Sequence, residues 1–177
     1  MNKSQALTDF QLNCQKYYIC YSLAAMGLKE FVDKFSKLHP NRANSLIVGA
    51  GHPDDGKWHG SINIGELLDA SQPDGTFLDT IAKSFISTIY SSWDEYYRNS
   101  IADEAGVEQK KVISNLMGDL RHIRHCIFHK KSILSNEPEK LKEISWKLVA
   151  GPLCISDEML QELMDQVNKM TVSIEGP

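Results

Sequence analysis

Two long stretches of the chain, residues 4–38 and 76–105, contain no proline, and Gly27 is their only glycine. Large apolar side chains recur through both at intervals of three and four residues, which is typical of amphipathic helices. The first stretch predicts one long helix or two abutting ones, ended by His39-Pro40, because the residue before a proline is disfavoured in helical geometry. Gly106 is expected to end the helix over 76–105. The chain should therefore be mainly α.

Residues 41–75 separate these two stretches and hold six of the eleven glycines and two of the six prolines. Short β-like segments at Ser45 to Val48 and Ser61 to Ile64 predict a long loop or a small hairpin between the first two long helices. A third helix is expected from about Glu108 to Ile133.

The last third of the chain predicts shorter elements. Pro138 is expected to open a short helix that runs to about Ile144, because proline is tolerated in a first helical turn. Residues 147–155 could be extended. Ser156 is a good cap for a final helix over 157–170, and residues 171–177 are expected to form a flexible tail.

Composition favours one globular domain, residues 1–177, with 42% hydrophobic and 24% charged residues. No apolar run approaches the roughly 20 residues that a membrane span needs. The N-terminus lacks the pattern of a secretory signal, so a cytoplasmic protein without membrane contact is expected. Four cysteines without a CxxC pair indicate reduced thiols. A net charge of −4 still permits a local basic site.

The segment from Asp119 to Lys131 is the most informative for function. At about 100° per residue, one side of its helix is apolar and is the expected core face. That face consists of Val112, Leu116, Leu120, Ile123 and Ile127. His122, His125 and His129 lie on the opposite side, within an arc of roughly 60°, and Arg121 lies beside them. These histidines are therefore expected to face away from the core.

Arg124 is nearer the border of the apolar face, roughly 140° from His129 around the helix axis. Its long side chain would have to curl to reach His129 within one chain. A site completed by a second subunit is an equally good expectation from this geometry.

Arg121, Arg124, Lys130 and Lys131 concentrate positive charge on this segment, against a single acidic residue. Arginine can bind a phosphodiester and stabilise charge that develops on it, and histidine can exchange a proton near neutral pH. Together they suit metal-independent RNA cleavage. Two alternatives remain open: a solvated basic face without a catalytic role, and a zinc site built from the histidines, for which the sequence places no acidic or cysteine partner.

The residues Arg124-His125-Cys126-Ile127-Phe128-His129 resemble the motif of the HEPN family. That motif consists of an arginine, usually a polar residue, a few variable positions and a histidine, and it lies near the end of a long helix. The order of helices also resembles the HEPN up-and-down helical bundle. The resemblance implies that Arg124 and His129 are the catalytic pair, with His125 at the polar position, where many members have asparagine. Arg121, His122, His125, Lys130 and Lys131 are the expected substrate-binding residues.

The resemblance also implies an activity and partners. An RNA 2′-hydroxyl would attack the adjacent phosphate without metal or cofactor, so DNA would not be cleaved. Members of the family commonly form homodimers around one RNA cleft. They include toxins and host-defence nucleases, often restrained by a nucleotidyltransferase-type antitoxin. Others only bind nucleotide, nucleic acid or protein, so a catalytically inactive binding module is the alternative function.

A second motif, His52-Pro53-Asp54-Asp55, resembles the metal-binding signature of the LmbE-like zinc deacetylases. By that resemblance His52 and Asp55 would bind zinc and Asp54 would act as a base. Gly56 stands where an acidic residue usually follows, and that family has an α/β sheet. A Pro-Asp-Asp-Gly turn explains the same residues through ordinary turn chemistry.

Overall fold

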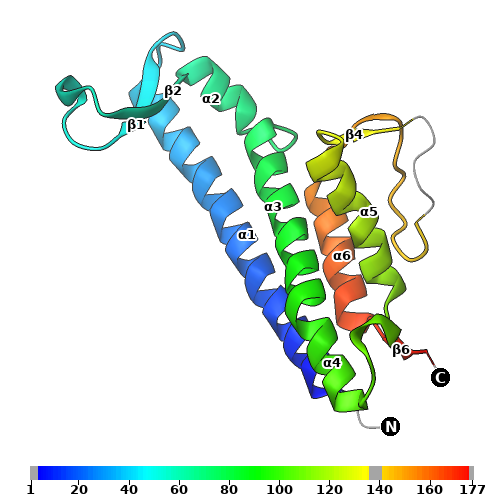
Figure 1. Cartoon of the computed structure of the whole chain (residues 1–177). Helices are drawn as coiled ribbons and strands as arrows, with labels where there is room; N and C mark the ends of the chain where they lie inside the picture. The colour runs from blue at the N-terminus through cyan, green and yellow to red at the C-terminus, as the bar shows by residue number, and fades with distance from the viewer. Residues whose placement is uncertain (1–3, 136–140, 176–177) are drawn as a thin grey trace. The chain divides into compact units, whose positions relative to one another are not determined.

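The protein is mainly helical, as expected (Figure 1). A computed structural model describes residues 4–135 and 141–175. Two compact units are present: unit 1 combines the chain up to Tyr21 with the chain from Ile81 onward, and unit 2 is Ser22–Thr80. The first helix, α1, is one uninterrupted helix, Gln5–Leu38. No helix among the described residues is long and apolar enough to cross a membrane.

The second long helical stretch contains an irregularity that the sequence did not predict. It runs as α3 (Thr76–Ser92), passes through a π-helical turn (Trp93–Tyr97), and continues as α4 (Arg98–Ala105). Gly106 ends it with a left-handed φ of 66°, as predicted. Such π turns are frequent at functional sites. Trp93 in this turn is buried, and its ring packs edge-on against Phe10 of α1 at a centroid distance of 5.3 Å.

Residues 41–75 were expected to form a long loop or a small hairpin, and unit 2 contains the hairpin. Strands β1 (Ser45–Gly49) and β2 (Trp58–Asn63) pair antiparallel. A 3-10 turn, Pro53–Asp55, lies between them. The strand expected to reach Ile64 ends at Asn63, whose side chain accepts a hydrogen bond from the Glu66 backbone N–H at 2.7 Å. This cap starts the short helix α2 (Ile64–Ala70), which was not predicted.

The third long helix begins later than predicted. The expected start near Glu108 is wrong: Gln109–Lys111 form a 3-10 turn and Val112–Ile113 form strand β3, before α5 spans Asn115–His129. Strand β3 pairs antiparallel with β6 (Ser173–Ile174). Val112, assigned above to the helical core face, is therefore buried in a strand. Part of the tail expected over 171–177 is likewise an ordered strand.

The C-terminal part completes unit 1. Strand β4 (Ile133–Leu134) pairs antiparallel with β5 (Gly151–Pro152). Of the helix expected over 138–144, residues 138–140 lie outside the described residues and 141–144 are not helical. The final helix α6 (Asp157–Lys169) begins at Ser156, whose side chain accepts from the Met159 N–H at 3.3 Å, as expected of a cap. Its Val167 carbonyl accepts a hydrogen bond from buried Gln11 of α1 at 2.8 Å.

The four cysteines provide a direct test of this packing. All are free thiols; Cys14 and Cys126 are buried, whereas Cys20 and Cys154 are exposed. Burial raises the pKa of the Cys14 thiol to about 12 and also raises the pKa of Cys126. Because the thiolate is the reactive form, we expect Cys20 and Cys154 to react quickly with a chromogenic disulfide reagent in native protein. Cys14 and Cys126 should react only after denaturation. Rapid reaction of all four thiols would contradict the packing.

Candidate functional site

Helix α5 carries five of the seven predicted site residues, namely Arg121, His122, Arg124, His125 and His129, and the two predicted lysines directly follow its end. Ser114 caps its start by accepting a hydrogen bond from the Met117 backbone N–H at 3.4 Å. Its core side is well packed, since Leu116, Leu120 and Ile123 are fully or almost fully buried. The helix is thus held along one face, and its other face is left to form a site.

The chain turns sharply immediately after His129. Lys131 and Ser132 adopt left-handed backbone geometry, with φ of 52° and 57°, which is uncommon for residues other than glycine. The backbone N–H of Ser132 donates to the Cys126 carbonyl at 3.0 Å, so the last helical turn is closed by a backbone hydrogen bond. Helix α5 therefore ends at His129, with Lys130 as its C-cap residue, and the predicted end at Ile133 is wrong because Ile133 belongs to strand β4.

A solvent-open hollow of about 730 Å³ lies along the histidine side of α5. We call it the basic groove. Its lining residues come from α3, the π turn, α4 and α5: Tyr90, Asp94, Arg98, Arg121, His122, Arg124, His125 and His129. The groove belongs wholly to unit 1.

Five of the seven predicted site residues line the basic groove, and two do not. The lysines Lys130 and Lys131 are exposed, but neither is among its lining residues. Lys130 instead borders a smaller hollow on another side of α5, together with His122 and Leu148. The predicted cluster of positive charge is therefore divided between different surfaces of the helix end.

The Arg124 side chain makes contacts with two aromatic rings. Its guanidinium lies over two aromatic rings, 5.4 Å from the centroid of Tyr90 and 5.3 Å from that of Phe128. Such cation–π contacts fix the orientation of the guanidinium plane. The Nε of Arg124 is buried, and no described residue accepts a hydrogen bond from it. Arg124 and His129 both belong to α5, and both line the basic groove.

Two of the histidines form a pair. The rings of His125 and His129 lie one helical turn apart, with centroids 4.8 Å from each other and an angle of 32° between their planes. Both side chains are exposed, as predicted from their position opposite the core face. Two imidazoles this close together can both contact the same chemical group of a ligand, and either imidazole can exchange a proton with that group.

The groove carries an excess of positive charge, with three arginines and one aspartate among its lining residues. Asp94 pairs with Arg98 at 3.3 Å, and Arg98 also donates from Nε to the Val112 carbonyl at 3.0 Å. Neither Arg121 nor Arg124 forms an ion pair with a described carboxylate. Two guanidinium groups are thus available to an anionic ligand.

Tyr90 lies between these charges. Burial, and then the nearby Asp94 carboxylate, raise the pKa of its phenol, although Arg121, Arg124 and Arg98 act in the opposite direction. The phenol therefore remains protonated at neutral pH and presents a hydroxyl group to the groove.

Sequence reasoning missed the wall of the groove opposite α5, formed by Tyr90, Asp94 and Arg98. These residues are spaced by four, which predicts that they lie along one side of a helix. The spacing was a usable signal for a polar stripe. That this stripe faces α5 is a consequence of packing between segments distant in sequence.

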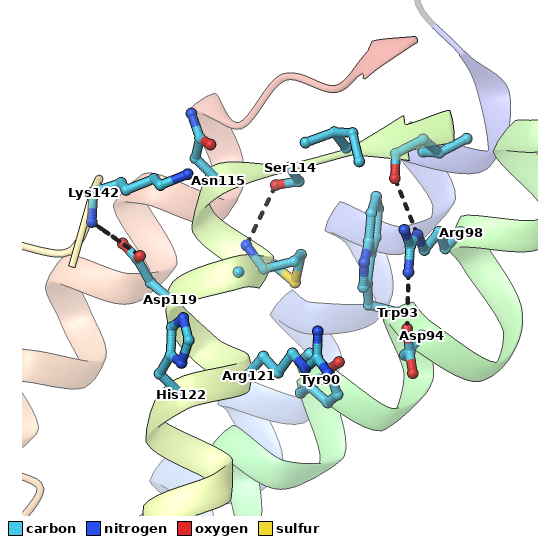
Figure 2. A pocket seen from close by; sticks show the side chains of 14 residues that line it. Tyr90, Trp93, Asp94, Arg98, Ser114, Asn115, Asp119, Arg121, His122 and Lys142 are labelled. Atoms are coloured by element: carbon cyan, nitrogen blue, oxygen red, sulfur yellow. Dashed lines mark hydrogen bonds and ion pairs between the residues drawn. The ribbon is translucent and has the colours of Figure 1, made fainter. Parts of the chain in front are cut away.

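A second hollow, the side pocket, of about 220 Å³, adjoins the basic groove (Figure 2). The two share Tyr90, Asp94, Arg98, Arg121 and His122. The remaining lining residues are Trp93, Val112, Ile113, Ser114, Asn115, Met117, Gly118, Asp119 and Lys142.

At the edge of the side pocket, Asp119 is 1% exposed, and its carboxylate accepts hydrogen bonds from the backbone N–H groups of Lys142, Glu143 and Ile144 at 2.7 to 2.9 Å. Both carboxylate oxygens of Asp119 are thus occupied by backbone donors.

The residues of the alternative zinc motif lie in unit 2 and interact within their own turn. The backbone N–H of His52 donates to an Asp55 carboxylate oxygen at 3.2 Å, and the backbone N–H of Asp54 donates to His52 Nδ1 at 3.3 Å. Within residues 4–135 and 141–175, no group of three or more His, Cys, Asp or Glu side chains is arranged to hold a metal ion. The turn interpretation accounts for these contacts.

Comparison with known proteins adds no relative. The sequence matches no family profile and no curated protein, and the structure matches no solved structure. The functional argument therefore depends on the residues and their geometry.

The contacts of Asp119 lead to a stability prediction. Asp119→Ala would leave three backbone N–H groups without their acceptor and should lower the free energy of unfolding by roughly 2–4 kcal/mol. Urea denaturation with an unchanged m-value would measure this loss. Asp165→Ala, which removes an exposed carboxylate from α6, is the matched control and should change stability by no more than about 0.5 kcal/mol. Equal effects of the two changes would refute the role of Asp119.

Proposed function

We propose that this protein is a metal-independent endoribonuclease with a HEPN-like helical bundle. The observation that carries the proposal is the basic groove, which brings Arg124, His125 and His129 together with Arg121 in a hollow containing one carboxylate. Phosphodiester cleavage requires groups that bind and stabilise negative charge and groups that transfer protons. The groove supplies both kinds.

RNA would bind through its phosphates. Arg121 and Arg124 have no carboxylate partner among the described residues, so they can pair with phosphate oxygens without first breaking an internal ion pair. Arg124 is also oriented in advance by Tyr90 and Phe128. Preorganised charge is effective in catalysis because no reorganisation is needed when negative charge develops in the transition state.

In the proposed reaction, the 2′-oxygen of one nucleotide forms a bond to the adjacent phosphorus, and the bond from phosphorus to the 5′-oxygen of the next nucleotide breaks. His129 accepts the proton of the 2′-hydroxyl, and Arg124 stabilises the charged transition state. His125, 4.8 Å away between ring centroids, is the candidate donor of a proton to the departing 5′-oxygen. The products are a 2′,3′-cyclic phosphate and a free 5′-hydroxyl.

We further propose that the protein acts as a homodimer in which each site takes residues from both copies. Within one chain, the Arg124 guanidinium contacts the Tyr90 and Phe128 rings, and in the proposed dimer it would act together with a His129 from the second copy. A toxin or host-defence role, with a nucleotidyltransferase-type antitoxin as regulator, follows from the HEPN resemblance and forms part of the same proposal.

A second candidate is a catalytically inactive module that uses the basic groove to bind nucleotide, nucleic acid or a protein partner. The observation that favours it is the engagement of Arg124 by two rings, because a held guanidinium can serve a structural role. Binding of RNA without cleavage at high protein concentration would support this candidate over the nuclease.

The proposed activity is tested with labelled single-stranded RNA in the presence of a chelator. Wild-type protein should cleave RNA to products with cyclic-phosphate ends and leave DNA of the same sequence intact. Arg124→Ala and His129→Ala should each reduce the rate by about a hundredfold or more, the usual range for general acid–base catalysis and transition-state stabilisation. Arg124→Lys should recover little activity, because an ammonium lacks the planar fork of arginine.

The matched control for these variants is His59→Ala, which removes an exposed histidine from β2 in unit 2. It should cleave at the wild-type rate. Absence of cleavage by folded wild-type protein on several RNA substrates would reject the nuclease. Equal cleavage by wild type and His129→Ala would instead indicate a contaminant or another site.

The shared dimer site makes its own prediction. When inactive Arg124→Ala and inactive His129→Ala proteins are mixed and allowed to exchange subunits, cleavage should return to about a quarter of the wild-type rate, because half of the dimers are mixed and each contains one intact site. Exchange can be monitored with fluorescently labelled subunits. If exchange occurs and activity does not return, both residues of a site come from the same chain.

A further inference from the structure

Gly118 occupies an unfavourable position for a glycine: it is the fourth residue of α5, and its backbone N–H donates a helical hydrogen bond to the Ser114 carbonyl at 3.0 Å. Glycine is unfavourable in a helix interior because it loses more backbone freedom on folding than any other residue. Close packing does not explain it: a Cβ atom at this position would meet no atom within 4 Å. The residue is exposed and lines the side pocket. The missing side chain thus leaves open space, and that space is part of a pocket.

The glycine also lies on the functional face of the helix. Gly118 is four, seven and eleven residues before His122, His125 and His129, so these positions lie within roughly 40° of Gly118 around the helix axis. Among these four positions on the same side of the helix, only Gly118 lacks a side chain. A larger residue here would extend along the histidine face into the side pocket.

The side pocket combines rings with polar and charged groups. Its lining includes the aromatic residues Tyr90 and Trp93 and the charged side chains of Arg98 and Arg121, while Asn115 supplies an amide. Its volume, about 220 Å³, is below the roughly 300–1,000 Å³ of pockets that hold drug-sized ligands, so one ring system is the appropriate occupant. The pocket also shares Tyr90 and Arg121 with the basic groove.

We propose that the side pocket binds a single nucleobase of the RNA strand whose phosphate lies in the basic groove, and that Gly118 keeps the pocket open for it. This inference rests on the proposed function. In RNA a base lies close to its phosphate, so adjoining hollows for a phosphate and for a ring match one nucleotide. Only an unpaired base can enter the pocket, and the protein therefore prefers single-stranded RNA.

The test measures binding to the full-length wild-type protein by titration calorimetry. The probes are the four ribonucleoside monophosphates, with the phosphate at the 3′ or the 5′ position, and inorganic phosphate. At least one nucleotide should bind about tenfold or more tightly than phosphate, as expected for a stacked base. Gly118→Leu should remove this advantage while leaving phosphate affinity unchanged, and Gly118→Ala should reduce it to a smaller extent. Both variants should melt at or above the wild-type temperature.

The matched control is Gly27→Leu, an equivalent change in the interior of α1, where a Cβ would also meet nothing within 4 Å. It should keep the nucleotide preference. Equal affinities of nucleotides and phosphate for wild type would overturn the base pocket, whatever the variants do. So would an unchanged preference in Gly118→Leu. Tighter binding of a nucleotide than of phosphate, without RNA cleavage, would reject the nuclease and support the base pocket. RNA cleavage without tighter nucleotide binding would support the nuclease and reject the base pocket.

Discussion

The buried carboxylate of Asp119 is the interaction on which the site depends. It accepts hydrogen bonds from three consecutive backbone N–H groups, those of residues 142–144, and so fixes a segment distant in sequence to helix α5. A buried charge is tolerated because these hydrogen bonds replace its hydration. With the apolar side of α5 packed by Leu116 and Leu120, the helix is held firmly, and its histidine face stays open to solvent.

This arrangement has an electrostatic consequence. The protein has a net charge of −4, yet its basic groove contains three arginines and one aspartate. Asp94 is paired with Arg98, and neither Arg121 nor Arg124 forms an ion pair with a described carboxylate, so both can pair with an anionic ligand. The aromatic rings that hold Arg124 do not neutralise it. The groove is thus suited to anions although the whole molecule is acidic.

Much of the fold could be predicted because its signals are local. The helices over residues 4–38 and 76–105, the left-handed Gly106 and the Ser156 cap each follow from spacing or from one residue type. The start of α5 was mispredicted, because strand β3 exists through pairing with β6, about 60 residues away in sequence. The π turn and α2 were missed, since neither has a distinctive apolar period.

For the site, the sequence by itself determined which residues share a face of α5, because the helical repeat fixes that His122, His125 and His129 point away from the core. Only the tertiary structure decided what they face. Packing of α5 beside α3 and α4 brought Tyr90, Asp94 and Arg98 to the groove and placed the Arg124 guanidinium over the Tyr90 ring. Lys130 and Lys131 were left outside the groove. The spacing of residues along one helix specifies the direction in which each side chain points. Which residues form the opposite wall of the groove depends on contacts between segments that are distant in sequence.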